Sequence, residues 1–198
     1  MTKKIPPKKT TSKKKPKVYE FTVTLVDTEP AVWRKFLAHE FIELTELHLL
    51  IQAVMGWSNS HGYQFEIGDE DYTDTHGEET EKTDINGLEL RDVLRKEKVF
   101  QYIYDFGDYW EHEVKITKVL EDDSRMTYPV CIGGENACPP ENCGGTGGFE
   151  GLKETLAGPD SPEKDEMLSF VGGFYNPKTF DPNFVNKNSL WLTEELDY

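Results

Sequence analysis

With 198 residues, 36% of them hydrophobic and 12% aromatic, the chain can bury one good core but not a second full domain. It has no apolar run long enough to span a membrane and no apolar N-terminal stretch typical of a secretory signal. Three cysteines, an odd number, argue against a disulfide framework and for a reducing compartment, so we expect a cytoplasmic protein with no membrane partner.

The net charge of −15 is unevenly distributed along the chain. Eight of the 22 basic residues are lysines within residues 1–17, which contain no acid, so 14 basic residues stand against 37 acidic ones in the rest. Such a body repels phosphate backbones, which restricts any nucleic-acid contact to a weak one through residues 1–17. This Lys-rich tail is predicted to be disordered, and a solubilising terminus is favoured over an arm for nucleic acid or an acidic partner. Residues 18–198 are predicted to form a single domain.

The first half of this domain shows the alternation of strands and then the periodicity of a helix. Apolar residues alternate over 18–27, and a second short strand starts at Pro30 and runs to Leu37, which indicates an antiparallel opening. A helix is predicted between an N-cap at Thr45 and a stop at Gly56. A further strand is predicted over 62–67.

The second half alternates between polar segments and short predicted elements. The nine acidic residues that come first are Glu66 and eight within 69–84. Over 69–84 we expect a long exposed loop with a short strand near Tyr72; the spacing of a calcium loop is absent. Further elements are predicted in this order: a helix over 88–94, a hairpin around Gly107-Asp108, a turn over 121–124, helices over 149–157 and 163–170, and a docking helix over 189–196. Together they predict an α+β fold: a mainly antiparallel sheet (ββαβ, then a β-hairpin), helices packed on one face, and a Cys/Pro/Gly-rich loop leading to C-terminal helices.

The predicted hairpin over 99–116 carries the densest chemistry of the chain. Alternation places four aromatic residues of its first strand on one face: Phe100, Tyr102, Tyr104 and Phe106. Gly107-Asp108 suits the turn because glycine accepts a positive φ. Beside the rings stand the four candidate catalytic residues: Asp105, Asp108, Glu111 and His112. They are able to shift one another's pKa, bind a metal or fix a turn, but strand alternation argues against one site made of all four.

The Cys/Pro/Gly-rich segment offers candidate metal ligands. Its thiols could complete a tetrahedral zinc site with a nearby histidine, so the candidates are Cys131, Cys138, Cys143, His112 and His61. No Cys-x-x-Cys pair is present, so structural cysteines are favoured, and zinc as a divalent metal is the one cofactor that the residues suggest. The glycines after Cys143 precede a helix whose N–H groups could meet an anion, although tight packing explains them more simply. His48, on the first helix, is expected to be exposed or at an edge.

Five motifs occur in a fixed order along the chain: Pro30-Ala-Val-Trp-Arg, Leu47-His with Ile51-Gln, Gly56-Trp through His61 and Phe65, Tyr104-Asp-Phe-Gly-Asp with Trp110 and His112, and Cys138-Pro-Pro-Glu-Asn-Cys-Gly-Gly. Together they resemble the plasmid pRiA4b ORF-three-like family, whose members are also labelled TnpR-type passenger proteins of transposable elements. The resemblance runs from about Tyr19 to about Phe184. Phe170 stands where relatives tend to have Trp, and Asn142 where they tend to have Asp. The resemblance implies a small α+β domain with no established biochemical role, found beside plasmids and mobile elements.

Two hypotheses of function follow. The leading one is a cytosolic, non-catalytic accessory or binding domain with an unknown protein or small ligand as its partner, because the sheet is rich in aromatic residues and no catalytic signature is complete. The alternative is a metal-dependent, phosphoesterase-like hydrolase that uses the hairpin tip with help from Glu141 or the cysteines. Recombinase chemistry is not carried over from the resolvase-like label, because the four arginines of the body are spread along the chain: Arg34, Arg91, Arg95 and Arg125.

Overall fold

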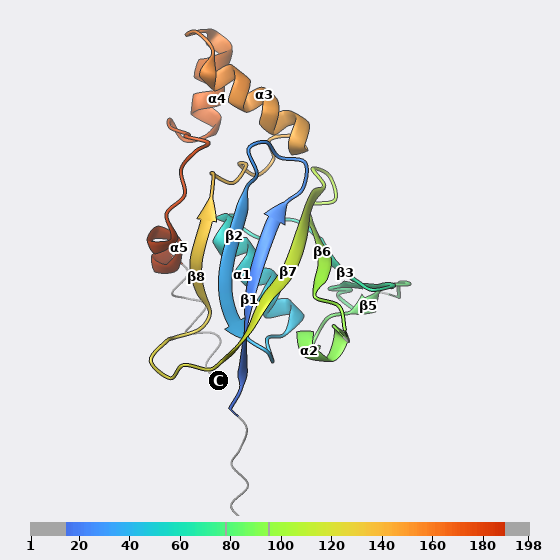
Figure 1. Cartoon of the computed structure of the whole chain (residues 1–198). Helices are drawn as coiled ribbons and strands as arrows, with labels where there is room; N and C mark the ends of the chain where they lie inside the picture. Colours follow the sequence, from blue (N-terminus) through green and yellow to red (C-terminus); the bar gives the residue numbers. More distant parts are fainter. Residues whose placement is uncertain (1–14, 78, 95, 189–198) are drawn as a thin grey trace, which may run out of the picture.

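An eight-stranded sheet forms the centre of the computed structural model, which describes residues 15–77, 79–94 and 96–188 (Figure 1). The spatial order is β5-β4-β3-β6-β7-β1-β2-β8, and every neighbouring pair is antiparallel except β4 with β5. The strands are β1 (Lys17–Leu25), β2 (Trp33–His39), β3 (Tyr63–Ile67), β4 (Glu70–Thr73), β5 (Thr83–Asp84), β6 (Val99–Tyr104), β7 (Trp110–Glu121) and β8 (Val130–Glu135). The predicted α+β fold with a mainly antiparallel sheet is confirmed.

Helices lie behind the sheet and at its ends. Among the described residues they are α1 (Leu44–Met55), α2 (Leu90–Val93), α3 (Gly145–Ala157), α4 (Pro162–Phe170) and α5 (Pro182–Asn188). Figure 1 shows α1 behind the sheet, α3 and α4 together at its upper end, and α5 beside β8. Within the described part of the chain, no helix is both long and apolar enough to cross a membrane.

The core lies between α1 and the sheet. Leu44, Leu47 and Ile51 recur at intervals of three to four residues, which places them on one face of α1, and all three are fully buried. They belong to one apolar cluster with Phe21 of β1 and Tyr102 of β6. Burying an aliphatic side chain of this size stabilises a fold by about 1.5–3 kcal/mol, so this face fixes α1 on the sheet.

Specific residues begin and end α1, and the end of the helix determines where the following loop begins. Glu43 is the N-cap, and its N–H donates to the carboxylate of Glu46 at 2.9 Å. The predicted N-cap, Thr45, was therefore wrong by two residues. Gly56 ends the helix as predicted, with a left-handed φ of 86° that glycine adopts without strain. The buried Arg34 donates through Nε to a carbonyl of the last turn at 2.9 Å, which ties α1 to β2.

Strands also occur in two segments predicted to be loops. The short β4 and β5 lie in the acidic segment 69–84, where β4 confirms the strand expected near Tyr72. The edge strand β8 contains Cys131, which was expected in a loop. β5 has only two residues and β8 contains Gly133 and Gly134, so neither shows a clear alternation of apolar side chains. The predicted helix over 189–196 falls outside the described residues.

The predicted Lys-rich tail, residues 1–17, lies mostly outside the described residues. Its last residue, Lys17, is the first residue of β1. The backbone N–H of Lys17 donates to the carboxylate of Glu40 at 3.0 Å, and its ammonium contacts Glu121. The sheet therefore begins at the last of the tail's lysines.

The tip of the β6–β7 hairpin is a five-residue loop over 105–109, not a two-residue turn. Asp105 and Tyr109 adopt positive φ values of 58° and 54°, whereas Gly107 does not, so the predicted role of Gly107 was wrong. The Asp105 carboxylate stabilises this conformation, because it accepts N–H bonds from Gly107 at 2.9 Å and Asp108 at 3.3 Å. The strand ends at Tyr104, and Phe106 is 51% exposed instead of sharing the buried face of the strand.

Candidate functional site

Three loops that are distant in sequence meet at one end of the sheet. They are the 56–62 loop between α1 and β3, the hairpin tip over 105–109, and the 136–144 loop between β8 and α3. The indole N–H of Trp57 donates to the carbonyl of Pro139 at 2.9 Å, which joins the first loop to the third. Motifs that the sequence presents separately are thus brought together.

The carboxylate of Glu141 is the acceptor at the centre of this junction. It accepts hydrogen bonds from the backbone N–H and the hydroxyl of Ser58, at 2.9 and 2.6 Å, and from the hydroxyl of Tyr104 at 2.6 Å. The backbone N–H of Ser60 donates to the same Tyr104 oxygen at 3.0 Å. Burial and the bond to Glu141 raise the pKa of Tyr104 to about 12. Burial alone would raise the pKa of Glu141, but the bonds from Ser58 and Tyr104 lower it, so the carboxylate stays ionised.

At the 56–62 loop, four residues form a closed ring of hydrogen bonds through three side chain–side chain bonds and one backbone N–H. The amide of Gln52 donates to the Tyr102 hydroxyl at 2.9 Å, which donates to Nδ1 of His48 at 2.8 Å. Nε2 of His48 donates to the side-chain oxygen of Asn59 at 2.7 Å, and the backbone N–H of Asn59 returns to Gln52 at 3.2 Å. This assignment gives each of the four bonds one donor and one acceptor and requires a neutral imidazole. Burial lowers the pKa of His48 to about 4, which agrees with that requirement.

The glycine-rich start of α3 packs against the hairpin tip. The Asp108 carboxylate accepts the backbone N–H of Gly144 at 3.1 Å, so the anion at this helix start is a side chain of the protein itself. A Cβ on Gly145 would lie 2.6 Å from the carbonyl oxygen of Asp108, and one on Gly148 would lie 1.8 Å from that of Cys143. Close backbone approach therefore explains Gly145 and Gly148, as the sequence analysis favoured.

His61 meets the hairpin as the sequence suggested. Its Nε2 lies 3.6 Å from Oδ2 of Asp105, and its ring packs edge-on against Tyr104 with centroids 5.8 Å apart. Its side chain is 29% exposed, and it is one wall of an open pocket.

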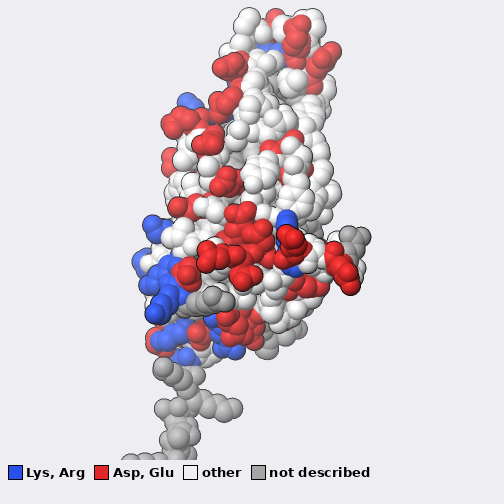
Figure 2. Space-filling model, turned by 90° about the vertical axis from the view of Figure 1, so that its right-hand side faces the viewer, with Lys and Arg blue, Asp and Glu red and all other residues white. Residues whose placement is uncertain are grey.

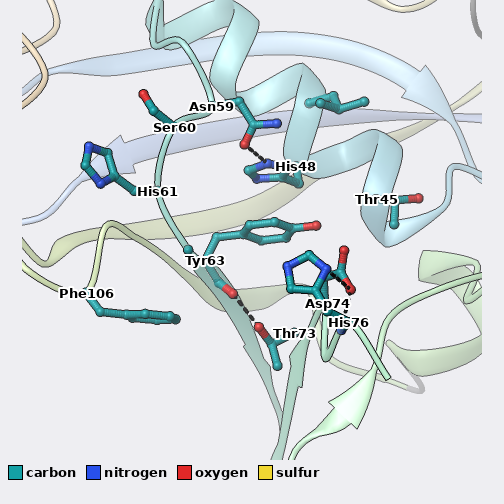
Figure 3. Close-up of a pocket in the computed structure, with 12 residues that line it drawn as sticks. Thr45, His48, Asn59, Ser60, His61, Tyr63, Thr73, Asp74, His76 and Phe106 are labelled. Carbon is teal, nitrogen blue, oxygen red and sulfur yellow. Dashed lines mark hydrogen bonds and ion pairs between the residues drawn. The ribbon is translucent and has the colours of Figure 1, made fainter. Parts of the chain in front are cut away.

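This pocket, the α1–β3 pocket, has a volume of about 680 Å³. Its walls come from the start of α1, the 59–63 segment, the 73–76 segment after β4, and Phe106 of the hairpin tip. Figure 3 shows Tyr63 in the centre, with His48 above it and His61 and His76 on opposite sides. The rings of His48 and Tyr63 stack with centroids 3.4 Å apart and planes within 2°. The ring of buried hydrogen bonds therefore holds one surface of the pocket through His48 and Asn59.

The four candidate catalytic residues are not gathered around one point. Asp105 and Asp108 accept backbone N–H bonds within the hairpin and from α3. His112 is fully buried, and its Nδ1 donates to the carbonyl of Tyr102 at 3.1 Å. Its neighbour Glu111 is half-buried and extends from the opposite face of β7, because side chains alternate along a strand. Asp105, Asp108 and His112 instead form hydrogen bonds that stabilise this corner of the sheet.

The candidate metal ligands also lie in different surroundings. Cys131 is in β8, and Cys138 and Cys143 are in the 136–144 loop. His112 is in the core, and His61 lines the pocket. All three thiols are free. Burial raises the pKa of Cys138 to about 12 and that of Cys143 to about 11, so both are protonated thiols at neutral pH. Across the described ranges, no group of three or more His, Cys, Asp and Glu side chains is placed to share a metal ion.

Several pocket residues were missed by sequence reasoning. His48 is 2% exposed, so its expected exposure was wrong. A signal was present, because His48 and Gln52 follow Leu44 at intervals of four and continue the buried face of α1. Asp74 and His76 carried no such signal, since they lie in the acidic segment expected to be solvated surface.

Comparisons with known proteins identify a family and two similar proteins. A family model described as plasmid pRiA4b ORF-3-like protein matches residues 17–184. The uncharacterized protein y4hQ of Sinorhizobium fredii (strain NBRC 101917 / NGR234) is 34% identical over 162 residues, which are 78% of this chain and 81% of that protein. The crystal structure of MM3350, a protein of unknown function from Methanosarcina mazei Go1, matches with a TM-score of 0.79 and 29% identity over 85% of this chain and 97% of that one. Neither name states a ligand or a reaction.

Proposed function

The chain belongs to the plasmid pRiA4b ORF-3-like family, and from this premise and the site geometry we propose that it is a non-catalytic binding domain whose ligand occupies the α1–β3 pocket. The observation that carries the proposal is the pocket itself. A volume of about 680 Å³ lies within the range of small-molecule sites, and aromatic and polar side chains line it together.

The support behind the pocket favours binding. The 56–62 loop is held by Glu141 and by the ring of His48, Gln52, Asn59 and Tyr102. A wall that is fixed before binding costs a ligand less ordering entropy, and this preorganisation raises affinity. No observation gives comparable support to the metal-dependent hydrolase. We further propose a reducing compartment such as the cytoplasm, on the ground of three free thiols. The association with mobile elements stays a prediction.

A fragment screen by ¹H–¹⁵N NMR tests the binding proposal, with cationic, neutral and anionic members in the library. We expect hits whose shift changes map to α1 and to the 59–63 and 73–76 segments. Ser60→Trp should abolish these changes, because the exposed Ser60 lines the pocket and an indole there would fill it.

The matched control is Ser124→Trp, the same substitution at an exposed serine in the turn after β7. It should leave binding unchanged, and thermal unfolding of both variants checks that they fold. Hits that survive Ser60→Trp, or that map to other surfaces, would show that the pocket is not the binding site.

A further inference from the structure

We infer that the group recognised in the α1–β3 pocket is an organic cation, an ammonium or a guanidinium. The inference rests on the proposed function, because it names the class of ligand for the same pocket. Among the described residues that line the pocket, Asp74 is the one carboxylate, and neither lysine nor arginine is present. Oδ1 of Asp74 lies 3.3 Å from Nδ1 of His76, so a ligand there meets a carboxylate whose neighbour in the pocket is an imidazole.

The surroundings add to this negative charge. Figure 2 shows Asp and Glu gathered on the side of the molecule that carries β3 to β5, and exposed acids there include Glu70, Asp71 and Asp84. Burial raises the pKa of Tyr63, and the nearby charges of Asp74 and Asp84 raise it further. Because Tyr63 stands in the centre of the pocket, the carboxylates of Asp74 and Asp84 act on the cavity as well as on this side chain.

Aromatic faces complete the recognition of a cation. The ring of Phe106 packs on the backbone of Gly62, where a Cβ would lie 2.8 Å from it, and half of the residue is exposed. The ammonium of Lys82, which donates to Oε1 of Gln64, lies 5.2 Å from the centre of this ring, so one cation already faces the ring. Tyr63 offers a second ring, held by its stacking on His48. A carboxylate beside aromatic faces suits an ammonium or guanidinium and disfavours an anion.

The test compares three probes of one shape and different charge: phenethylammonium, 2-phenylethanol and phenylacetate. Dissociation constants are measured by NMR titration at pH 8 and low ionic strength. We expect the ammonium to bind at least tenfold more tightly than the alcohol, and phenylacetate to bind most weakly. Agmatine and the peptide acetyl-Gly-Arg-Gly-amide then distinguish a free cation from an arginine side chain, according to which binds more tightly.

Two variants connect the preference to Asp74. In the wild-type protein the Asp74 carboxylate accepts the backbone N–H of His76 at 2.9 Å. In Asp74→Asn the amide oxygen can still accept this bond, so the local turn is kept. We expect this variant to weaken phenethylammonium binding about tenfold and to leave 2-phenylethanol within twofold. Asp69→Asn removes one exposed charge beside β4 without touching the pocket, and should change ammonium binding less than twofold.

The outcomes separate this inference from the proposed function. If the alcohol binds in the pocket as tightly as the ammonium, or if Asp74→Asn binds the ammonium as well as the wild type does, the cation inference is wrong and the binding function stands. If no probe and no fragment perturbs the pocket, the binding function itself is wrong and the inference fails with it.

Discussion

Replacing Gly148 by alanine is expected to lower the free energy of unfolding by about 3 kcal/mol, a large effect for one methyl group. The added Cβ would lie 1.8 Å from the carbonyl oxygen of Cys143 and 2.7 Å from its carbonyl carbon. Both are backbone atoms, so the start of α3 must move away from the 136–144 loop. That movement would also disturb the bond between the N–H of Gly144 and the carboxylate of Asp108.

Gly147→Ala is the matched control, one residue away in the same turn. A Cβ at Gly147 meets nothing within 4 Å, so alanine should stabilise the helix by about 0.5–1 kcal/mol. Urea unfolding of both variants measures the difference. Equal stability of the two variants would contradict the close packing of α3 against the loop.

Acidification from pH 7 to pH 5 is expected to lower the free energy of unfolding by about 3–4 kcal/mol through His48 and His112 together. Burial lowers the pKa of each to about 4 in the folded protein, against an ordinary value of 6.5. Between these values the unfolded chain takes up protons that the folded chain refuses, so stability falls as pH falls. Each group contributes up to about 1.4 kcal/mol per pH unit within that window.

Urea unfolding at several pH values measures this slope, and the range ends at pH 5 to avoid the titration of carboxylates. His48→Gln removes one of the two groups and should reduce the slope by about half. NMR titration of the imidazole resonances gives the two pKa values directly. Folded-state values near 6 for both rings, or a flat stability profile, would overturn the assignment of two buried neutral histidines.

Local patterns were sufficient to predict much of the fold. The alternation over 18–27 marks β1, and the apolar spacing and Gly56 mark α1, because burial and backbone conformation act within a few residues. The same reasoning failed at Gly107, whose neighbour Asp105 takes the left-handed conformation with the help of its own carboxylate. Because a side chain stabilises this turn, the position of a glycine is not sufficient to predict its backbone conformation.

The candidate site was less predictable because its parts are joined across the chain. The hydroxyl of Tyr102 bonds to Gln52 and His48, which precede it by 50 and 54 residues. Glu141 meets Ser58 across 83 residues. No periodicity reports such pairings, so the sequence left open whether the hairpin tip is a catalytic cluster or a turn, and in the structure the carboxylates of Asp105 and Asp108 accept backbone N–H bonds.

The structure therefore assigns different roles to the two polar clusters. The Glu141 junction and the ring of hydrogen bonds through His48 hold the 56–62 loop from within the protein. The α1–β3 pocket beside them is open, and its described lining residues present aromatic rings and one carboxylate to a ligand. A rigid frame next to an open cavity is the arrangement expected of a binding site.

A crystal structure of the protein soaked with phenethylammonium would show whether the α1–β3 pocket binds an organic cation. We predict electron density in this pocket, with the ammonium nitrogen within hydrogen-bond or ion-pair distance of Asp74 and the ring against Tyr63 or Phe106. Density confined to another surface, or an empty pocket at a probe concentration that saturates the NMR titration, would contradict it.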